Sequence, residues 1–175
     1  MAQLPISELI IRLKSVKFTL EQEAQNIVAV AAMDLKGLSE TNILNRGVAK
    51  YSPVKLPTFW YRDKTLNQRG TQWIKDNDWG SWGEFRKAQG LQVAYVDLFY
   101  SGHMWHNTGV VRIERVGSKF IAYLGGQDKK AADHLFYMSK LYGPFITANV
   151  SSEDKAFINN NAQQTYINIL KQVGV

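Results

Sequence analysis

The chain has 175 residues, no cysteine and a formal net charge of +6 at pH 7. A chain of this length is typical of a single domain and buries about 70% of the surface that its unfolded form exposes. The lack of cysteine excludes a disulfide framework and a thiolate nucleophile, no apolar run of roughly 18 residues is present to span a bilayer, and no secretory signal is visible, so we expect folding in a reducing cytoplasm.

The N-terminal part of the sequence predicts two helices. Apolar residues recur at helical spacing from Ile6 to Val16, which is typical of a short amphipathic helix or of the first part of a longer one. A second helix is expected from about Leu20 to Lys36, opened by the capping-box pair Thr19 and Gln22. Gly37 is a suitable residue just past its end.

Helical periodicity fades between Leu38 and Gln92, where prolines and glycines interrupt a polar and aromatic stretch. We expect short helices near Thr41 to Lys50 and Trp82 to Gln89, with exposed loop between them. So long a segment without structure is usually functional or ordered only by a partner. We therefore interpret about residues 47–80 as an extended arm that is mobile in an isolated subunit and ordered in an assembly.

Basic charge is concentrated in the same part of the chain. From Lys36 to Lys75, eight basic residues stand against two acidic ones, and aromatic residues are mixed with them. This mixture fits single-stranded nucleic acid, whose bases stack on aromatic rings, but Trp, Tyr and Arg are also enriched at protein-binding hot spots. We favour protein docking, because no oligonucleotide-binding or RNA-recognition signature is present. The candidate docking residues are Lys50, Lys55, Trp60, Arg62, Lys64, Arg69, Trp73 and Trp79.

The C-terminal half predicts a β hairpin followed by two helices. Val110 to Val116 and Lys119 to Leu124 are rich in β-compatible residues and meet at Gly117-Ser118. A helix is expected from Asp128 to Tyr142, stopped by Gly143-Pro144. The last helix begins at Ser151 or Ser152, where hydroxyl and acidic residues suit a helix N-terminus. Its apolar face comprises Phe157, Ile158, Ala162, Thr165, Tyr166, Ile169 and Leu170.

Three histidines, His103, His106 and His134, are candidate ligands for zinc or a similar ion. On a loop or strand, however, a separation of three residues directs side chains to opposite faces, and no His-Glu-x-x-His motif is present. We expect no metal site and no cofactor.

Two acidic residues, Glu84 and Asp97, are candidates for the carboxylate pair of a glycoside hydrolase, with Trp79, Trp82 and Trp105 as sugar platforms. The simpler interpretation makes Glu84 a helix surface residue and Asp97 the cap of a turn or the partner of a base. No Gly-x-Ser-x-Gly nucleophile and no phosphate-binding loop accompanies them. We therefore expect a protein that is not an enzyme.

The C-terminal half presents a series of motifs in a fixed order: the segment Val96 to Met104, the hairpin and helix after it, Pro144-Phe145-Ile146, and Ser151 to Asp154 leading into a closing helix. In this order the motifs resemble the tail-completion and neck proteins of tailed bacteriophages. Leu98 to Gly102 stands for the Leu-x-x-Thr-Gly-like turn of that family, with Ser in place of Thr. The customary Arg ahead of the Phe is absent, and the segment from Phe59 to Trp82 has no counterpart that we can assign.

The resemblance implies a structural virion protein of the phage neck, assembled in the bacterial host cytoplasm. Such a protein forms a homo-oligomeric ring, expected to be a hexamer, that joins the head-side portal or connector to the tail-tube protein. The basic region would then face a neighbouring subunit, the connector or DNA in the channel, and no membrane is involved. The alternative is a nucleic-acid or carbohydrate binding module that uses the aromatic-basic loop.

For the fold, we expect a single α+β domain over residues 1–175. Long N-terminal helices and a C-terminal helix pack on a small antiparallel β-sheet, and the extended arm projects from them. The exposed edges of so small a sheet are suited to pairing between subunits, and a closed ring requires heterologous contacts of that kind.

Overall fold

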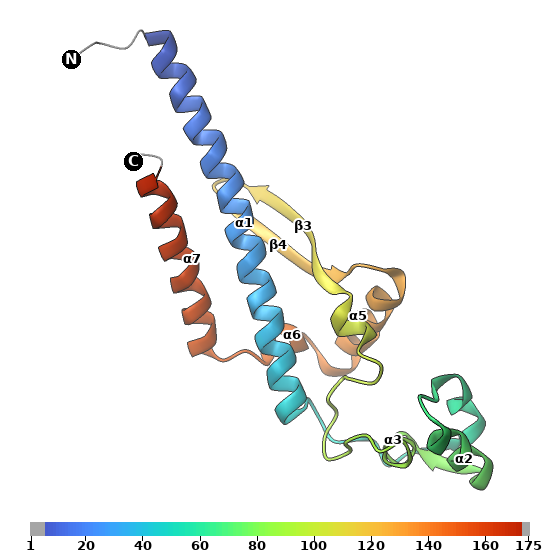
Figure 1. The fold of residues 1–175 in the computed structure, drawn as a ribbon. Helices are drawn as coiled ribbons and strands as arrows, with labels where there is room; N and C mark the ends of the chain where they lie inside the picture. Colours follow the sequence, from blue (N-terminus) through green and yellow to red (C-terminus); the bar gives the residue numbers. More distant parts are fainter. Residues whose placement is uncertain (1–5, 173–175) are drawn as a thin grey trace.

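A computed structural model describes residues 6–172 and shows an α+β fold in which one very long helix organises the rest of the chain (Figure 1). The strands form two separate two-stranded antiparallel sheets, β1 with β2 and β3 with β4. The elements, in chain order, are α1 (Ile6–Arg46), β1 (Lys55–Pro57), the 3₁₀ helix η1 (Thr58–Lys64), α2 (Gln68–Asp76), β2 (Trp79–Ser81), α3 (Trp82–Ala88), α4 (His103–His106), β3 (Thr108–Val116), β4 (Lys119–Gly126), α5 (Lys129–Tyr142), α6 (Phe145–Ala148) and α7 (Ser152–Gln172).

Helix α1 corrects the prediction of two N-terminal helices and a third near Thr41 to Lys50. It runs unbroken for 41 residues, about 60 Å at the rise of an α-helix. Gly37 lies inside it, with open space where a side chain would be. The actual C-terminal glycine is Gly47, which has a φ of 71° and donates its N–H to the Ile43 carbonyl (2.8 Å). The sequence contains two glycines that could end this helix, and tertiary packing carries it past the first.

The body of the molecule is built around α1, against which α7, β3, β4 and α6 pack. Helix α7 runs antiparallel beside it, so the described ends of the chain lie at the same end of the molecule, and the β3–β4 hairpin crosses α1 (Figure 1). Helices α5 and α6 close the lower part of the body. The predicted helix after Asp128 is confirmed, with the Asp128 side chain accepting a hydrogen bond from the Ala131 N–H (2.7 Å). The start of the last helix at Ser152 is confirmed as well.

The hairpin forms where the sequence predicts it, with Gly117 at its turn in a left-handed conformation (φ 63°). Phe120, Ala122 and Leu124 of β4 are half-buried, while Ile121 and Tyr123 alternate with them and are exposed. A β-bulge interrupts the alternation of β3, because the register jumps from Val110 to Arg112. One face of the hairpin is thus covered and the other lies open.

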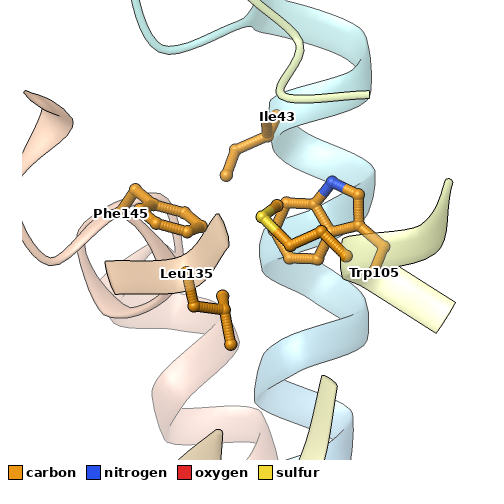
Figure 2. Close-up of a cluster of buried hydrophobic side chains, with 5 residues drawn as sticks. Ile43, Trp105, Leu135 and Phe145 are labelled. Carbon is orange, nitrogen blue, oxygen red and sulfur yellow. The ribbon is translucent and has the colours of Figure 1, made fainter. Parts of the chain in front are cut away.

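The hydrophobic core of the body is small. Its buried members are Ile43 of α1, Trp105 and its neighbour Met104 of α4, Leu135 of α5 and Phe145 of α6. Figure 2 shows Ile43, Trp105, Leu135 and Phe145 converging from these four helices, and the rings of Trp105 and Phe145 meet edge to face with centroids 5.9 Å apart. The Trp105 Nε1 is buried without an acceptor among the described residues. This cluster joins the end of α1 to the C-terminal half.

The segment between α1 and α4 corrects the expectation of exposed loop. It contains β1, η1, α2, β2 and α3. The arm expected at about residues 47–80 is thus replaced by a folded segment of residues 55–88, and from here on the arm means these residues. The arm lies beyond the C-terminal end of α1, away from the hairpin and α7 (Figure 1). The predicted helix near Trp82 to Gln89 is confirmed as α3. The arm is therefore a small folded unit attached to the body by residues 47–54 and 89–102.

Candidate protein-docking surfaces

Four aromatic rings form the core of the arm. Tyr61 of η1 stacks on Phe85 of α3, with ring centroids 4.9 Å apart and planes 13° apart. Trp73 of α2 and Trp82 of α3 pack on the same Phe85 ring at 5.7 and 5.4 Å. Aromatic pairs at such separations stabilise beyond the area they bury. Trp73, one of the candidate docking residues, is half-buried in this cluster and builds the arm itself.

Backbone pairing and a helix cap hold the frame of the arm. Strand β1 pairs with β2, placing Pro57 opposite Trp79, and the Tyr61 hydroxyl donates to the Gly80 carbonyl (2.9 Å). Ser81 and Glu84 form a capping box at the start of α3. The pKa of Glu84 is lowered, first because the Ser81 N–H donates to the carboxylate and further by Lys55, whose Nζ lies 3.6 Å away. Glu84 therefore has a structural role at a helix start.

A buried ion pair anchors the arm to its connecting segment. Arg86 and Asp97 are 3% and 5% exposed, and their Nη2 and Oδ2 atoms lie 2.9 Å apart. The guanidinium also donates to the carbonyls of Phe99 (2.6 Å) and Gln92 (3.2 Å). The Tyr51 hydroxyl donates to the other Asp97 oxygen (3.4 Å), and burial raises the pKa of Tyr51 to about 12. Asp97 thus pairs with a base, as the simpler of the two interpretations of this residue predicts, and not the glycoside-hydrolase interpretation.

Asp97 also shapes the turn on which the phage resemblance rests. Its Oδ1 accepts the Phe99 N–H (3.0 Å), which is the pattern of an Asx turn. Leu98 adopts a positive φ of 52°, rare for a residue with a side chain. Gly102, with φ 74°, then caps α4. Helix α4 follows this turn, and β3 begins after α4.

The surface of the arm combines basic and apolar side chains. Trp60 and Trp79 are 57% and 61% exposed, and Lys55 is exposed beside Glu84. Trp60, Arg62 and Lys64 share η1, whereas the other exposed bases lie on separate elements, Lys50 in the connecting segment and Arg69 on α2. Phe59 is exposed on this surface as well, and so are two apolar residues that sequence reasoning missed because the stretch has no periodicity: Leu66 in the arm and Val54 just before it.

The histidines lie on two helices of the body, His103 and His106 at the ends of α4 and His134 within α5. His103 Nε2 lies 3.0 Å from an Asp128 carboxylate oxygen. The pKa of Asp128 is lowered mainly by the Ala131 N–H and further by His103, while burial lowers the pKa of His134. Among residues 6–172, no group of three or more histidine and acidic side chains is arranged to hold a metal ion. The structure therefore links His103 to the cap of α5.

The body carries large apolar side chains on its surface. The N-terminal half of α1 extends past the hairpin (Figure 1) and exposes Ile6, Ile11, Leu13 and Phe18, each by at least 60%. The uncovered face of the hairpin adds Ile121 and Tyr123, and α7 adds Phe157. Exposed apolar patches usually mark sites of association, and these side chains are distributed over α1, the hairpin and α7. The body thus has more apolar surface than its small core requires.

Two grooves lie along α1. The first, of about 370 Å³, is bounded by α1, the hairpin turn and Tyr166 of α7, and the Arg115–Glu21 ion pair lies in its wall. The second, of about 260 Å³, lies between α1 and α7. Apolar Ile27, Val30 and Ile158 line it, together with the acidic Glu23 and Asp34. We call the second the acidic groove.

In the part of the chain that the structure describes, no helix combines the length and hydrophobicity needed to cross a lipid bilayer.

Comparison of this chain with protein-family models, with curated proteins and with solved structures finds no match.

Proposed function

We propose that the chain is a structural virion protein of a tailed-bacteriophage neck, acting in tail completion or head–tail joining. It would assemble in the bacterial host cytoplasm as a homo-oligomeric ring, in our proposal a hexamer, between the head-side portal or connector and the tail tube. The proposal combines the sequence resemblance with one structural observation, the large apolar surface that the body leaves uncovered.

That surface supports a subunit of an assembly. The N-terminal half of α1 holds its apolar side chains in solvent, although burying one such side chain is worth about 1.5–3 kcal/mol. A helix exposed in this way has few stabilising contacts, because most helix stability in proteins comes from packing of an apolar face. A neighbouring copy or the connector would supply the missing cover.

The test is the mass and shape of the purified protein. Native mass spectrometry, with electron microscopy of the same sample, is expected to show a closed ring of identical subunits that adds to tailless heads or to purified connector. A monomer at all concentrations, with no binding to connector or tail tube, would contradict the proposal.

A binding module for nucleic acid or carbohydrate is the second candidate. The observation that favours it is the exposure of Trp60 and Trp79 on a surface that also carries Arg62 and Arg69, since stacking rings and cations together bind single strands. Such binding would weaken steeply with salt as phosphate contacts release counterions. Salt-dependent binding by a protein that never forms rings would favour this module.

A further inference from the structure

We propose that the acidic groove between α1 and α7 receives η1 of the arm from a second copy of this chain. The inference rests on the proposed self-assembly and names the contact that produces it.

The acidic groove offers apolar walls with negative charge at its side. Val30 is 60% exposed at this site, and Ile27 and Ile158 lie deeper. Glu23 and Asp34 contribute two carboxylates, and no basic residue is present among the described residues that line it. In a chain of net charge +6 this is an unusual surface. The larger groove near the hairpin differs, because Arg115 already neutralises Glu21 there.

Helix η1 has the complementary chemistry. Phe59 and Trp60 are each 57% exposed and meet edge to face with centroids 6.2 Å apart. Arg62 and Lys64 follow in the last turn of η1 and are exposed. Aromatic anchors with adjacent arginine are the residue types that dominate binding energy at interfaces. Apolar rings would enter the groove while the bases approach Glu23 and Asp34.

The groove and η1 of one copy are held apart. Asp34 lies twelve residues before the end of α1, about 18 Å along the helix, and the arm extends beyond that end (Figure 1). The root of the arm is fixed by backbone hydrogen bonds between Val48 and Val96 and between Val96 and Ala49 (2.8 and 2.7 Å). The Tyr95 hydroxyl also donates to the Leu44 carbonyl (2.7 Å). The occupant must therefore come from another copy.

Two different surfaces that meet only between copies make a heterologous contact. Repetition of such a contact gives a ring when the rotation closes and a filament when it does not. The proposed contact thus accounts for self-assembly with one surface pair, using the arm that the body does not need for its own core.

The absence of cysteine permits a direct test by disulfide trapping. Phe59→Cys protein is mixed with Val30→Cys protein and oxidised, and a cross-linked heterodimer is expected in high yield. The matched control pairs Phe59→Cys with Lys119→Cys, which places the second thiol on the exposed hairpin turn. Equal yields in the two mixtures would overturn the inference.

A charge exchange tests the electrostatic part. Arg62→Glu/Lys64→Glu and Glu23→Lys/Asp34→Lys are each expected to weaken self-association at least tenfold, measured by analytical ultracentrifugation. Combining all four substitutions in one chain is expected to restore it. Lys119→Glu/Lys129→Glu, which changes the charge equally at exposed residues that neither belong to η1 nor line the groove, is expected to retain association.

The outcomes separate this inference from the proposed function. Rings that form in the Arg62→Glu/Lys64→Glu protein, without trapping between residues 59 and 30, overturn the arm-to-groove contact and leave the ring. Specific trapping with restored association, but only open filaments or dimers, supports the contact and contradicts the neck ring. A wild-type chain that neither associates nor cross-links overturns both.

Discussion

The arm packs its aromatic residues against one another, whereas the N-terminal half of α1 holds its apolar residues in solvent. In the arm, Tyr61 and Phe85 are 4% and 0% exposed. In α1, Ile6 and Phe18 are 77% and 65% exposed. The arm has the weaker sequence pattern of the two segments, yet it is the better packed. Internal packing and apparent regularity of sequence are therefore separate properties in this molecule.

Because the arm and the N-terminal half of α1 differ in side-chain packing, a binding partner would have a different effect on each. The arm has its own aromatic core and ion pair, so a partner would bind to its surface without having to order it. The first half of α1 has regular backbone hydrogen bonds but little side-chain packing, so a partner would cover it. Differences in local stability of this kind are measurable by amide hydrogen exchange.

The largest effects are expected from truncating the central aromatic residue of each region. Trp105→Ala is expected to lower the free energy of unfolding of the body by about 3–5 kcal/mol, because it empties the place where α1, α4, α5 and α6 meet. Phe85→Ala is expected to cost a similar amount within the arm. Denaturant unfolding and residue-resolved hydrogen exchange measure the two effects.

Comparing Trp105→Ala with Phe85→Ala shows whether the arm and the body unfold separately. Phe85→Ala is expected to accelerate exchange in α2 and α3 while α5 stays protected. Equal loss of protection in α5 would show that arm and body unfold as one unit. Trp105→Phe is the matched control and should cost much less than Trp105→Ala, because it keeps a ring and removes an N–H that has no acceptor among the described residues.

Breaking the ion pair at the root of the arm should have the next largest effect. Asp97→Ala leaves the Arg86 guanidinium buried without its carboxylate, and the expected cost is roughly 3 kcal/mol, the lower end for a broken buried pair. The carbonyls of Gln92 and Phe99 still accept from the guanidinium, which limits the loss. Thermal unfolding measures it. A loss as small as that of an exposed pair would mean that water reaches this site.

The sequence predicts the C-terminal half better than the N-terminal half for a physical reason. The hairpin and α5 each carry a local signal, Gly117 at the turn and Asp128 at the helix start, and the structure uses both. In the arm, α3 has a local signal in the Ser81–Glu84 capping box, but the rest of the arm has no helical or strand periodicity. Its order depends on aromatic contacts between residues far apart along the chain, such as Tyr61 with Phe85, which no local pattern reports.

The candidate docking residues divide in the same way. Exposure of Trp60 and Trp79 agrees with a role at a surface, but Trp73 is half-buried and packs on Phe85. Composition marks aromatic residues as important without distinguishing those that pack inside from those left outside. The acidic groove was equally invisible, because Glu23 and Ile158 come together only when α7 lies against α1.

Gly37 gives a smaller effect that tests the continuity of α1. Because Gly37 is helical and a Cβ atom would meet no atom within 4 Å, Gly37→Ala is expected to stabilise the protein by about 1 kcal/mol, the difference in helix propensity. Thermal unfolding should show a higher Tm. Gly47→Ala is the matched control and should destabilise, because Gly47 has a φ of 71° and lies against Tyr95. A lower Tm for Gly37→Ala would show that the helix ends there.

The smallest effect concerns the pH dependence of the arm through Glu84. Its pKa in the folded protein lies below the ordinary value of 4.5, chiefly because the Ser81 N–H donates to the carboxylate. A depressed pKa stabilises the folded state above the unfolded pKa, and that contribution is lost as pH falls through the lower folded value. The contribution is about 0.5 kcal/mol, since the Glu84 side chain is 47% exposed and solvent screens its pairing with Lys55.

Glu84→Gln keeps a hydrogen-bond acceptor for the cap and removes the titration. Hydrogen exchange of the α3 amides is therefore expected to differ between the two proteins at pH 6 and to converge as the pH falls through the lowered pKa of Glu84. High salt should reduce the part due to Lys55 and leave the backbone part, because only the exposed pair is strongly screened. A difference that grows as the pH falls would contradict the capping role assigned to Glu84. It would also mean that the Ser81–Glu84 capping box does not determine why α3 begins immediately after β2.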